Sequence, residues 1–132
     1  MAGERDLTKL LGGMQPRLNP GRYVFTVVTG PAPVGVKPVV TVAEDEGLTL
    51  VLRKEEADAA GLAYAYVAGW ITLRVHSALE AVGLTAAVAQ ALARAGLSCN
   101  VVAGCHHDHL FVPYERAAEA VELLETLAAE AA

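Results

Sequence analysis

Short apolar runs separated by turn residues make up the first half of the chain. β-Branched and aromatic residues at 23–29 predict a strand, whereas three prolines and two glycines in the nine residues 30–38 predict a loop. Two later apolar runs flank a polar turn that ends at Gly47, which predicts a β-hairpin. The expected elements are a helix at 6–11 capped by Asp6 and stopped by Gly12 and Gly13, a turn at 19–21, a strand at 23–29, a loop at 30–38, hairpin strands at 39–43 and 48–52, and a helix at 54–60.

Longer elements are expected in the second half. Residues 64–76 predict the longest strand, because Ile71, Leu73 and Val75 alternate with more polar residues. Apolar residues at helical spacing predict a helix at 83–95, which Gly96 ends. The remaining expected elements are hairpin strands at 99–104 and 110–112 and a helix from about Pro113 onward.

The two halves resemble each other when the sequence is shifted by sixty residues. The shift places Val42-Ala43 on Val102-Ala103 and Leu50-Val51-Leu52 on Leu110-Phe111-Val112. This repeat predicts an α+β fold made by tandem duplication, with helices on one side of an antiparallel sheet and with units at 1–63 and 64–132. The first copy is expected to be incomplete, because the loop 30–38 stands where the second copy has its long helix. Chance similarity between two apolar hairpins is the alternative.

Several segments of the chain resemble a family of uncharacterised bacterial proteins with tandem ACT-like domains. The motifs that carry the resemblance are LRVHSALEAVGLTA, NVVAG and HDHLFVP in the second half and LTKLLGGMQPRLNPGRYVF and EGLTLVLRKEEADAAGL in the first. The resemblance implies ferredoxin-like topology. ACT domains resemble sensors that bind amino acids or related small molecules at subunit interfaces, so it also implies a regulatory role. It supplies no enzymatic activity, and we expect a protein that is not an enzyme.

Composition and charge narrow the range of partners. With 54% hydrophobic and 19% charged residues, the 132-residue chain is expected to fold as a globular protein. A net charge of −5 and scattered basic residues argue against nucleic acid. The longest apolar stretch, 62–73, is too short to span a membrane and the N-terminus lacks a signal-peptide core, so a cytoplasmic protein with reduced cysteines is expected.

A ligand site is expected where the strand 64–76 joins the helix 83–95. The first amides of a helix have no partner within it, and the positive end of its dipole attracts a carboxylate. Gly83 would let an amino acid approach the backbone, and backbone carbonyls or Asn100 from a neighbouring strand would receive its ammonium. The alternative is an ordinary strand-to-helix loop in which the glycine serves packing. The expected ligand-binding residues are His76, Ser77, Val82, Gly83, Leu84, Thr85 and Asn100.

Potential metal ligands gather in the segment 105–109. On a regular strand Cys105, His107 and His109 would share one face and suit Zn²⁺, Ni²⁺ or Cu²⁺. A turn would break that alternation, and the repeat places a polar hairpin turn at the same position of the first half. A hydrolytic site that pairs Cys99 or Cys105 with a histidine lacks an evident orienting group and oxyanion site. We therefore expect no catalytic residues and no cofactor, and we rank metal binding below the small-molecule site.

The second face of the strand 64–76 carries Thr72, Arg74 and His76, and exposed strand faces and edges favour pairing. This predicts that the face forms the sheet of a homodimer or binds a partner, while a solvated face, or one covered by the first unit, is the alternative. Trp70 is expected to pack rather than to stack on a ligand. The competing function is a structural or protein-interaction module that has no ligand and contacts an enzyme through its sheet.

Overall fold

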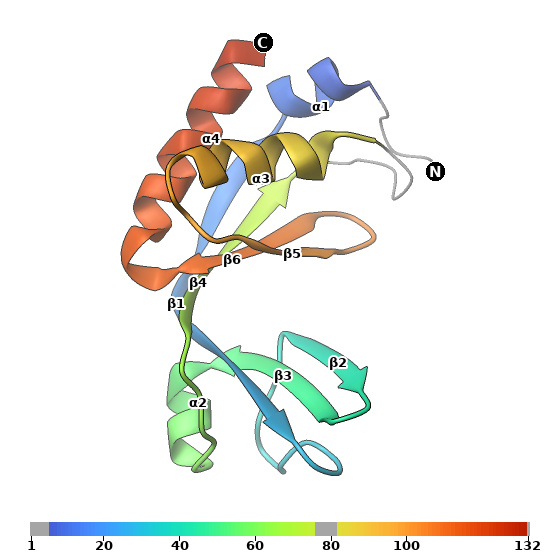
Figure 1. Ribbon diagram of the computed structural model, residues 1–132, viewed down its shortest axis with the longest axis vertical. Coiled ribbons are helices and arrows are strands. Elements are labelled where there is room, and N and C mark those ends of the chain that lie inside the picture. The colour runs from blue at the N-terminus through green and yellow to red at the C-terminus, as the bar shows by residue number, and fades with distance from the viewer. Residues whose placement is uncertain (1–5, 76–81, 132) are drawn as a thin grey trace. The chain divides into compact units, whose positions relative to one another are not determined.

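The computed structural model describes residues 6–75 and 82–131, and their contacts form two compact units (Figure 1). Unit 1 consists of residues 1–20 and 69–132, and unit 2 consists of residues 21–68. The predicted division into 1–63 and 64–132 follows the repeat, whereas these units follow contacts in space. The two divisions differ because the first twenty residues fold with the C-terminal segment.

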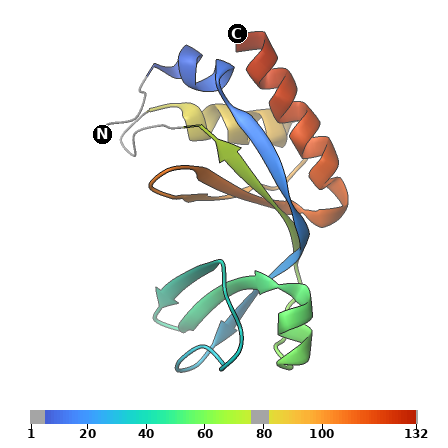
Figure 2. The same cartoon turned by 180° about the vertical axis from the view of Figure 1, so that it is seen from behind.

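Unit 1 has ferredoxin-like topology. Its sheet has the strand order β1-β4-β6-β5, and helices lie on one face of it (Figures 1 and 2). The strand β1 comes from the N-terminal part of the chain and occupies the place beside β4. The elements are α1 (Leu7–Gly12), the first part of β1 (Gln15–Val28), most of β4 (Val67–Arg74), α3 (Leu84–Arg94), β5 (Asn100–Ala103), β6 (Asp108–Pro113), the 3₁₀ turn η1 (Tyr114–Arg116) and α4 (Ala117–Ala131).

The core of unit 1 lies between its sheet and its helices. Ile71 and Leu73 of β4 are fully buried, as their alternation predicted, and Val88 and Leu92 of α3 face the same core. Burial of one such side chain contributes about 1.5–3 kcal/mol. The core residues are Leu10, Met14, Ile71, Leu73, Val75, Leu84, Val88, Leu92, Leu97, Leu110, Val112, Ala117, Ala120 and Leu124.

Unit 2 is a smaller version of the same topology. It contains the second part of β1, β2 (Val40–Glu44), β3 (Gly47–Arg53) and α2 (Lys54–Ala59), and its strand order is β2-β3-β1. All neighbouring strands are antiparallel, with Val27 opposite Thr49 and Glu44 opposite Gly47. The segment 29–39 is irregular, so the predicted loop does replace a helix between β1 and β2. The core consists of Val24, Leu50, Leu52 and Ala57.

The helix ends follow the predicted chemistry. The Asp6 carboxylate accepts a hydrogen bond from the Lys9 amide at 3.1 Å and caps α1. Gly61 and Gly96 adopt the positive φ values of 69° and 75° after α2 and α3, which lets the chain leave each helix. The strand order and the placement of the helices confirm the predicted α+β, ferredoxin-like fold class.

Three of the predicted elements need correction: a turn, the start of a strand and the start of a helix. The predicted turn at 19–21 is wrong, because β1 continues through it: the Asn19 side chain donates to the neighbouring β4, and Gly21 accommodates a φ of 99° within the strand. The strand predicted from residue 64 begins only at Val67, and Tyr64, which precedes it, packs against the core of unit 2, the unit to which it belongs. Pro113 ends β6 rather than starting a helix, and α4 begins at Ala117.

Candidate functional site

The start of α3 on unit 1 presents backbone amides that have no hydrogen-bond acceptor inside the helix. Gly83 is the N-cap residue with a φ of 102°, and none of the side chains that the structure describes caps the first turn. The Gly83 carbonyl accepts the first helical hydrogen bond, from the Ala87 amide at 2.9 Å, so the amides of residues 84–86 have no partner within the helix. A Cβ on Gly83 would lie 3.1 Å from Cδ2 of Leu7, which places α1 directly against this turn.

The structure brings together only part of the predicted ligand site. Val82 and Thr85 are exposed beside Gly83, whereas the Leu84 side chain is buried in the core of unit 1. Asn100 is exposed at the first position of β5, and β5 starts on the side of the unit where α3 ends (Figure 1). It therefore does not join Gly83. His76 and Ser77 lie outside the described residues.

The predicted metal ligands do not converge. Cys105 is exposed in the β5–β6 hairpin, while His109 lies within β6 and contacts Trp70. The Nδ1 atom of His107 is buried and has no hydrogen-bond partner among the residues that the structure describes. Within 6–75 and 82–131, no three His, Cys, Asp or Glu side chains form a group that could hold a metal ion. This geometry does not support a metal centre in the segment 105–109.

His109 is part of a hydrogen-bonded network that joins three strands of unit 1. The Trp70 indole donates to His109 Nδ1 at 3.1 Å, and the Thr72 hydroxyl lies 3.4 Å from the same atom. Asn19 Nδ2 donates to Thr72 Oγ1 at 2.9 Å and to the Trp70 carbonyl at 3.2 Å. The Trp70 ring also stacks on Phe111. Trp70 is thus a packing residue, as predicted, with a polar contact that the sequence did not reveal.

This network fixes the protonation state of His109. An indole N–H can only donate, so Nδ1 must be an unprotonated acceptor and the imidazole proton resides on Nε2. Burial lowers the pKa of His109, and the nearby His107 lowers it further. Burial raises the pKa of the adjacent Asp108 carboxyl. Both groups are therefore held toward their uncharged forms.

Cys99 lacks the environment of a catalytic nucleophile. Cys99 packs against the core of unit 1, and burial raises the pKa of its thiol to about 11. A thiol with such a pKa is almost entirely protonated at neutral pH and is a poor nucleophile. Cys105 is exposed in the hairpin.

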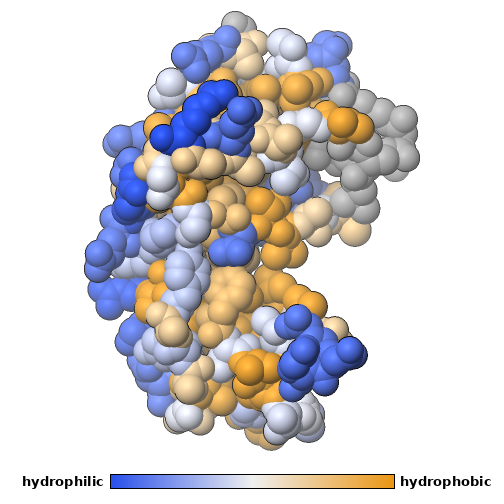
Figure 3. Space-filling model, in the orientation of Figure 1, coloured by the Kyte–Doolittle hydropathy of each residue, from blue (hydrophilic) through white to orange (hydrophobic). Residues whose placement is uncertain are grey.

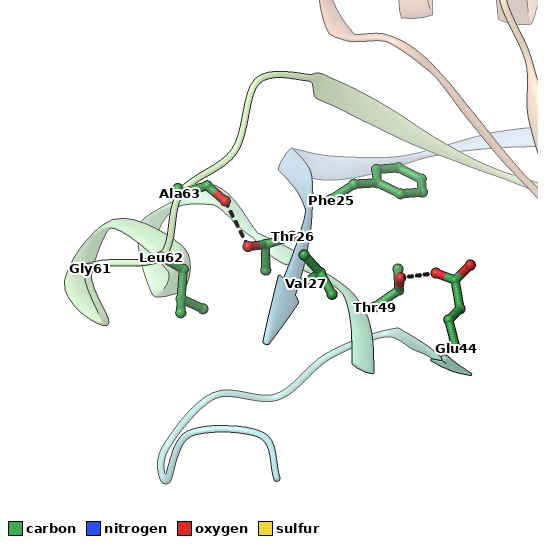
Figure 4. A pocket seen from close by; sticks show the side chains of 8 residues that line it. All are labelled: Phe25, Thr26, Val27, Glu44, Thr49, Gly61, Leu62 and Ala63. Carbon is green, nitrogen blue, oxygen red and sulfur yellow. Dashed lines mark hydrogen bonds between the residues drawn. The ribbon is translucent and has the colours of Figure 1, made fainter. Parts of the chain in front are cut away.

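Unit 2 contains a pocket that the sequence did not predict (Figure 4). Its volume is about 580 Å³. Thr26 donates to the Ala63 carbonyl at 2.6 Å, and Thr49 donates to the Glu44 carboxylate. The lining residues are Phe25, Thr26, Val27, Glu44, Thr49, Gly61, Leu62 and Ala63. They come from three separate segments, so no local motif could have indicated them.

Comparisons with known proteins agree with this architecture. Two family models, both described as ACT domain, match residues 2–69 and 66–126. A solved structure of a protein of unknown function from Vibrio cholerae, described as a possible transport protein, is 48% identical, with a TM-score of 0.85 over 92% of this chain and 95% of that chain. Among curated proteins, none matches the chain.

Two more distant structures share the fold. A protein from Agrobacterium tumefaciens has a TM-score of 0.68 at 18% identity, covering 87% of this chain and 89% of that chain. The regulatory subunit of aspartate kinase from Thermus flavus has a TM-score of 0.65 at 11% identity, covering 86% and 96%. No helix within the described ranges has the length and apolar character that a membrane crossing requires.

Proposed function

Since the chain belongs to the ACT-domain family, we propose that it is a non-catalytic regulatory module whose ligand is a small molecule, an amino acid in the first instance. The observation that carries this proposal is the start of α3, where no described side chain caps the helix and amides without a partner inside the helix meet the positive end of its dipole. An amino-acid carboxylate matches both features. Val82 and Thr85, exposed on either side of Gly83, would border the ligand.

The regulatory role has indirect support from a fold relative. The aspartate kinase protein that shares this fold is itself named a regulatory subunit. We therefore propose that ligand binding changes how this chain contacts a partner. We also propose a homodimer, which light scattering coupled to size-exclusion chromatography would test against a monomer.

A charge placed at the start of α3 tests the ligand site. The twenty amino acids are screened by thermal shift, and any that stabilises the protein is titrated by calorimetry. Thr85→Asp puts a carboxylate into the first turn, which should stabilise the free protein by about 0.3–1 kcal/mol through the helix dipole and should abolish binding of a ligand carboxylate. Thr85→Asn has nearly the same shape without the charge and should retain binding. Absence of any binder, or equal binding by both variants, would contradict the proposal.

One observation favours the alternative of a ligand-free interaction module. β2 is at the edge of the sheet of unit 2, and its Val42 side chain is 47% exposed. An exposed edge strand can pair with a strand of another protein. Recovery of one specific enzyme with the tagged protein from its own host, unchanged by amino acids, would support this alternative.

A further inference from the structure

We propose that the pocket of unit 2 is a second ligand site and that it takes an organic amine, an ammonium group on an apolar body without a carboxylate. This goes beyond the proposed function, which rests on α3 of unit 1 and on a ligand carboxylate. The volume of about 580 Å³ lies within the range of roughly 300–1,000 Å³ that is typical of small-molecule sites. Such sites combine apolar walls with a few fixed polar groups, and this pocket has the same combination.

The apolar part of the ligand has a surface to rest on. Phe25 and Val27 are two residues apart on β1, so their side chains project from the same face of the sheet. Val27 is 56% exposed although it is apolar, so an apolar ligand would remove its side chain from water. Leu62 lines the pocket from another segment, on the far side of β1 in the close view (Figure 4).

The polar end of the pocket carries a fixed negative charge. Thr49 is the cross-strand neighbour of Val27, and its hydroxyl donates to Oε1 of Glu44. This hydrogen bond holds the carboxylate one strand away from the apolar surface, and an ammonium can reach it through its second oxygen, Oε2. Among the residues that line the pocket, only Glu44 is charged.

The surrounding charge selects against a carboxylate. Glu44 begins an acidic turn, Glu44-Asp45-Glu46, whose three side chains are all exposed, and Figure 3 shows hydrophilic surface over the β2–β3 turn beside apolar surface of unit 2. The negative potential of this turn attracts an ammonium and repels a carboxylate. The pocket should therefore prefer an amine to the amino acid that differs from it only by a carboxylate.

Matched ligand pairs test this preference. The full chain, labelled with ¹⁵N, is titrated with phenethylamine and 3-methylbutylamine, and separately with phenylalanine and leucine, which add only a carboxylate. The amines should shift the amide signals of residues 25–27 and 61–63, and the amino acids should not shift them. Glu44→Gln keeps an oxygen for Thr49 but removes the charge, so the amines should bind at least about tenfold more weakly to it.

Glu46→Gln is the matched control, because it removes one charge from the acidic turn without altering a residue that lines the pocket. Amine affinity should stay within about twofold in this variant. The proposal is overturned if millimolar amines leave these signals unchanged, if amino acids bind there as well as amines, or if both variants weaken binding equally. Thr85→Asp should leave amine binding intact, so failure of the α3 site and failure of this site give different results.

Discussion

A methyl group added at Gly69 should destabilise unit 1 by overpacking. Gly69 lies in β4, and a Cβ built on it would be 2.6 Å from the Cβ of Ala117 at the start of α4. Carbon atoms pack at about 3.5–4.0 Å, so the strand and the helix would have to separate by roughly 1 Å. The φ of Gly69 is not in the positive region, so alanine adds no backbone strain, and the loss from the close contact is offset only by the smaller entropy of the unfolded chain.

Overpacking of a well-packed core costs about 1–3 kcal/mol, and we expect Gly69→Ala to lower the free energy of unfolding by that amount. Urea denaturation followed by Trp70 fluorescence and by circular dichroism would measure it. Ala117→Gly alone should cost about 1–2 kcal/mol, because it removes both a helix-favouring residue and a buried methyl group.

The double variant provides the decisive comparison. Without the Cβ of residue 117, the added methyl group has space, so Gly69→Ala with Ala117→Gly should be more stable than Gly69→Ala alone. The coupling energy should be about 1 kcal/mol or more in favour of the pair. Additive losses, or a Gly69→Ala protein as stable as the parent, would refute the close approach of β4 and α4.

Three further outcomes are expected. Because the pKa of His109 is lowered on folding, the unfolded state binds more protons than the folded state as the pH falls below about 6.5. Acid should therefore destabilise the parent protein more than the His109→Gln variant, and the fluorescence of Trp70 should change in the same pH range. Parallel profiles of unfolding free energy against pH for the two proteins would disprove this. At pH 8 a thiol reagent should modify the exposed Cys105 well before Cys99, whose pKa is about 11, as mass spectrometry of the labelled peptides would show. Arg116 donates to the Ala95 carbonyl at 2.9 Å and pairs with a carboxylate of α4, so Arg116→Ala should lower the melting temperature, and an unchanged value would show that this cap contributes nothing.

The sequence indicated part of the candidate sites. The start of α3 could be located because a glycine precedes an amphipathic helix, and the structure places Gly83 at its N-cap. Asn100 was assigned to the same site, yet it stands where β5 begins, beyond the other end of α3. The pocket of unit 2 gave no signal in the sequence, since its walls come from residues 25–27, from Glu44 and Thr49, and from residues 61–63, which only folding brings together.

Local features of this protein were determined by the sequence alone. Alternation placed Ile71 and Leu73 in the core, and Asp6 and Gly96 marked helix ends, because each of these signals depends on residues within a few positions of one another. The sixty-residue repeat predicted the duplicated α+β layout. The tertiary structure decided that β1 serves both units and that Asn19 contacts Thr72, fifty-three residues away. The physical reason is that a buried polar group needs a hydrogen-bond partner, which packing can supply from any part of the chain. No periodicity in the sequence indicates which residue that partner will be.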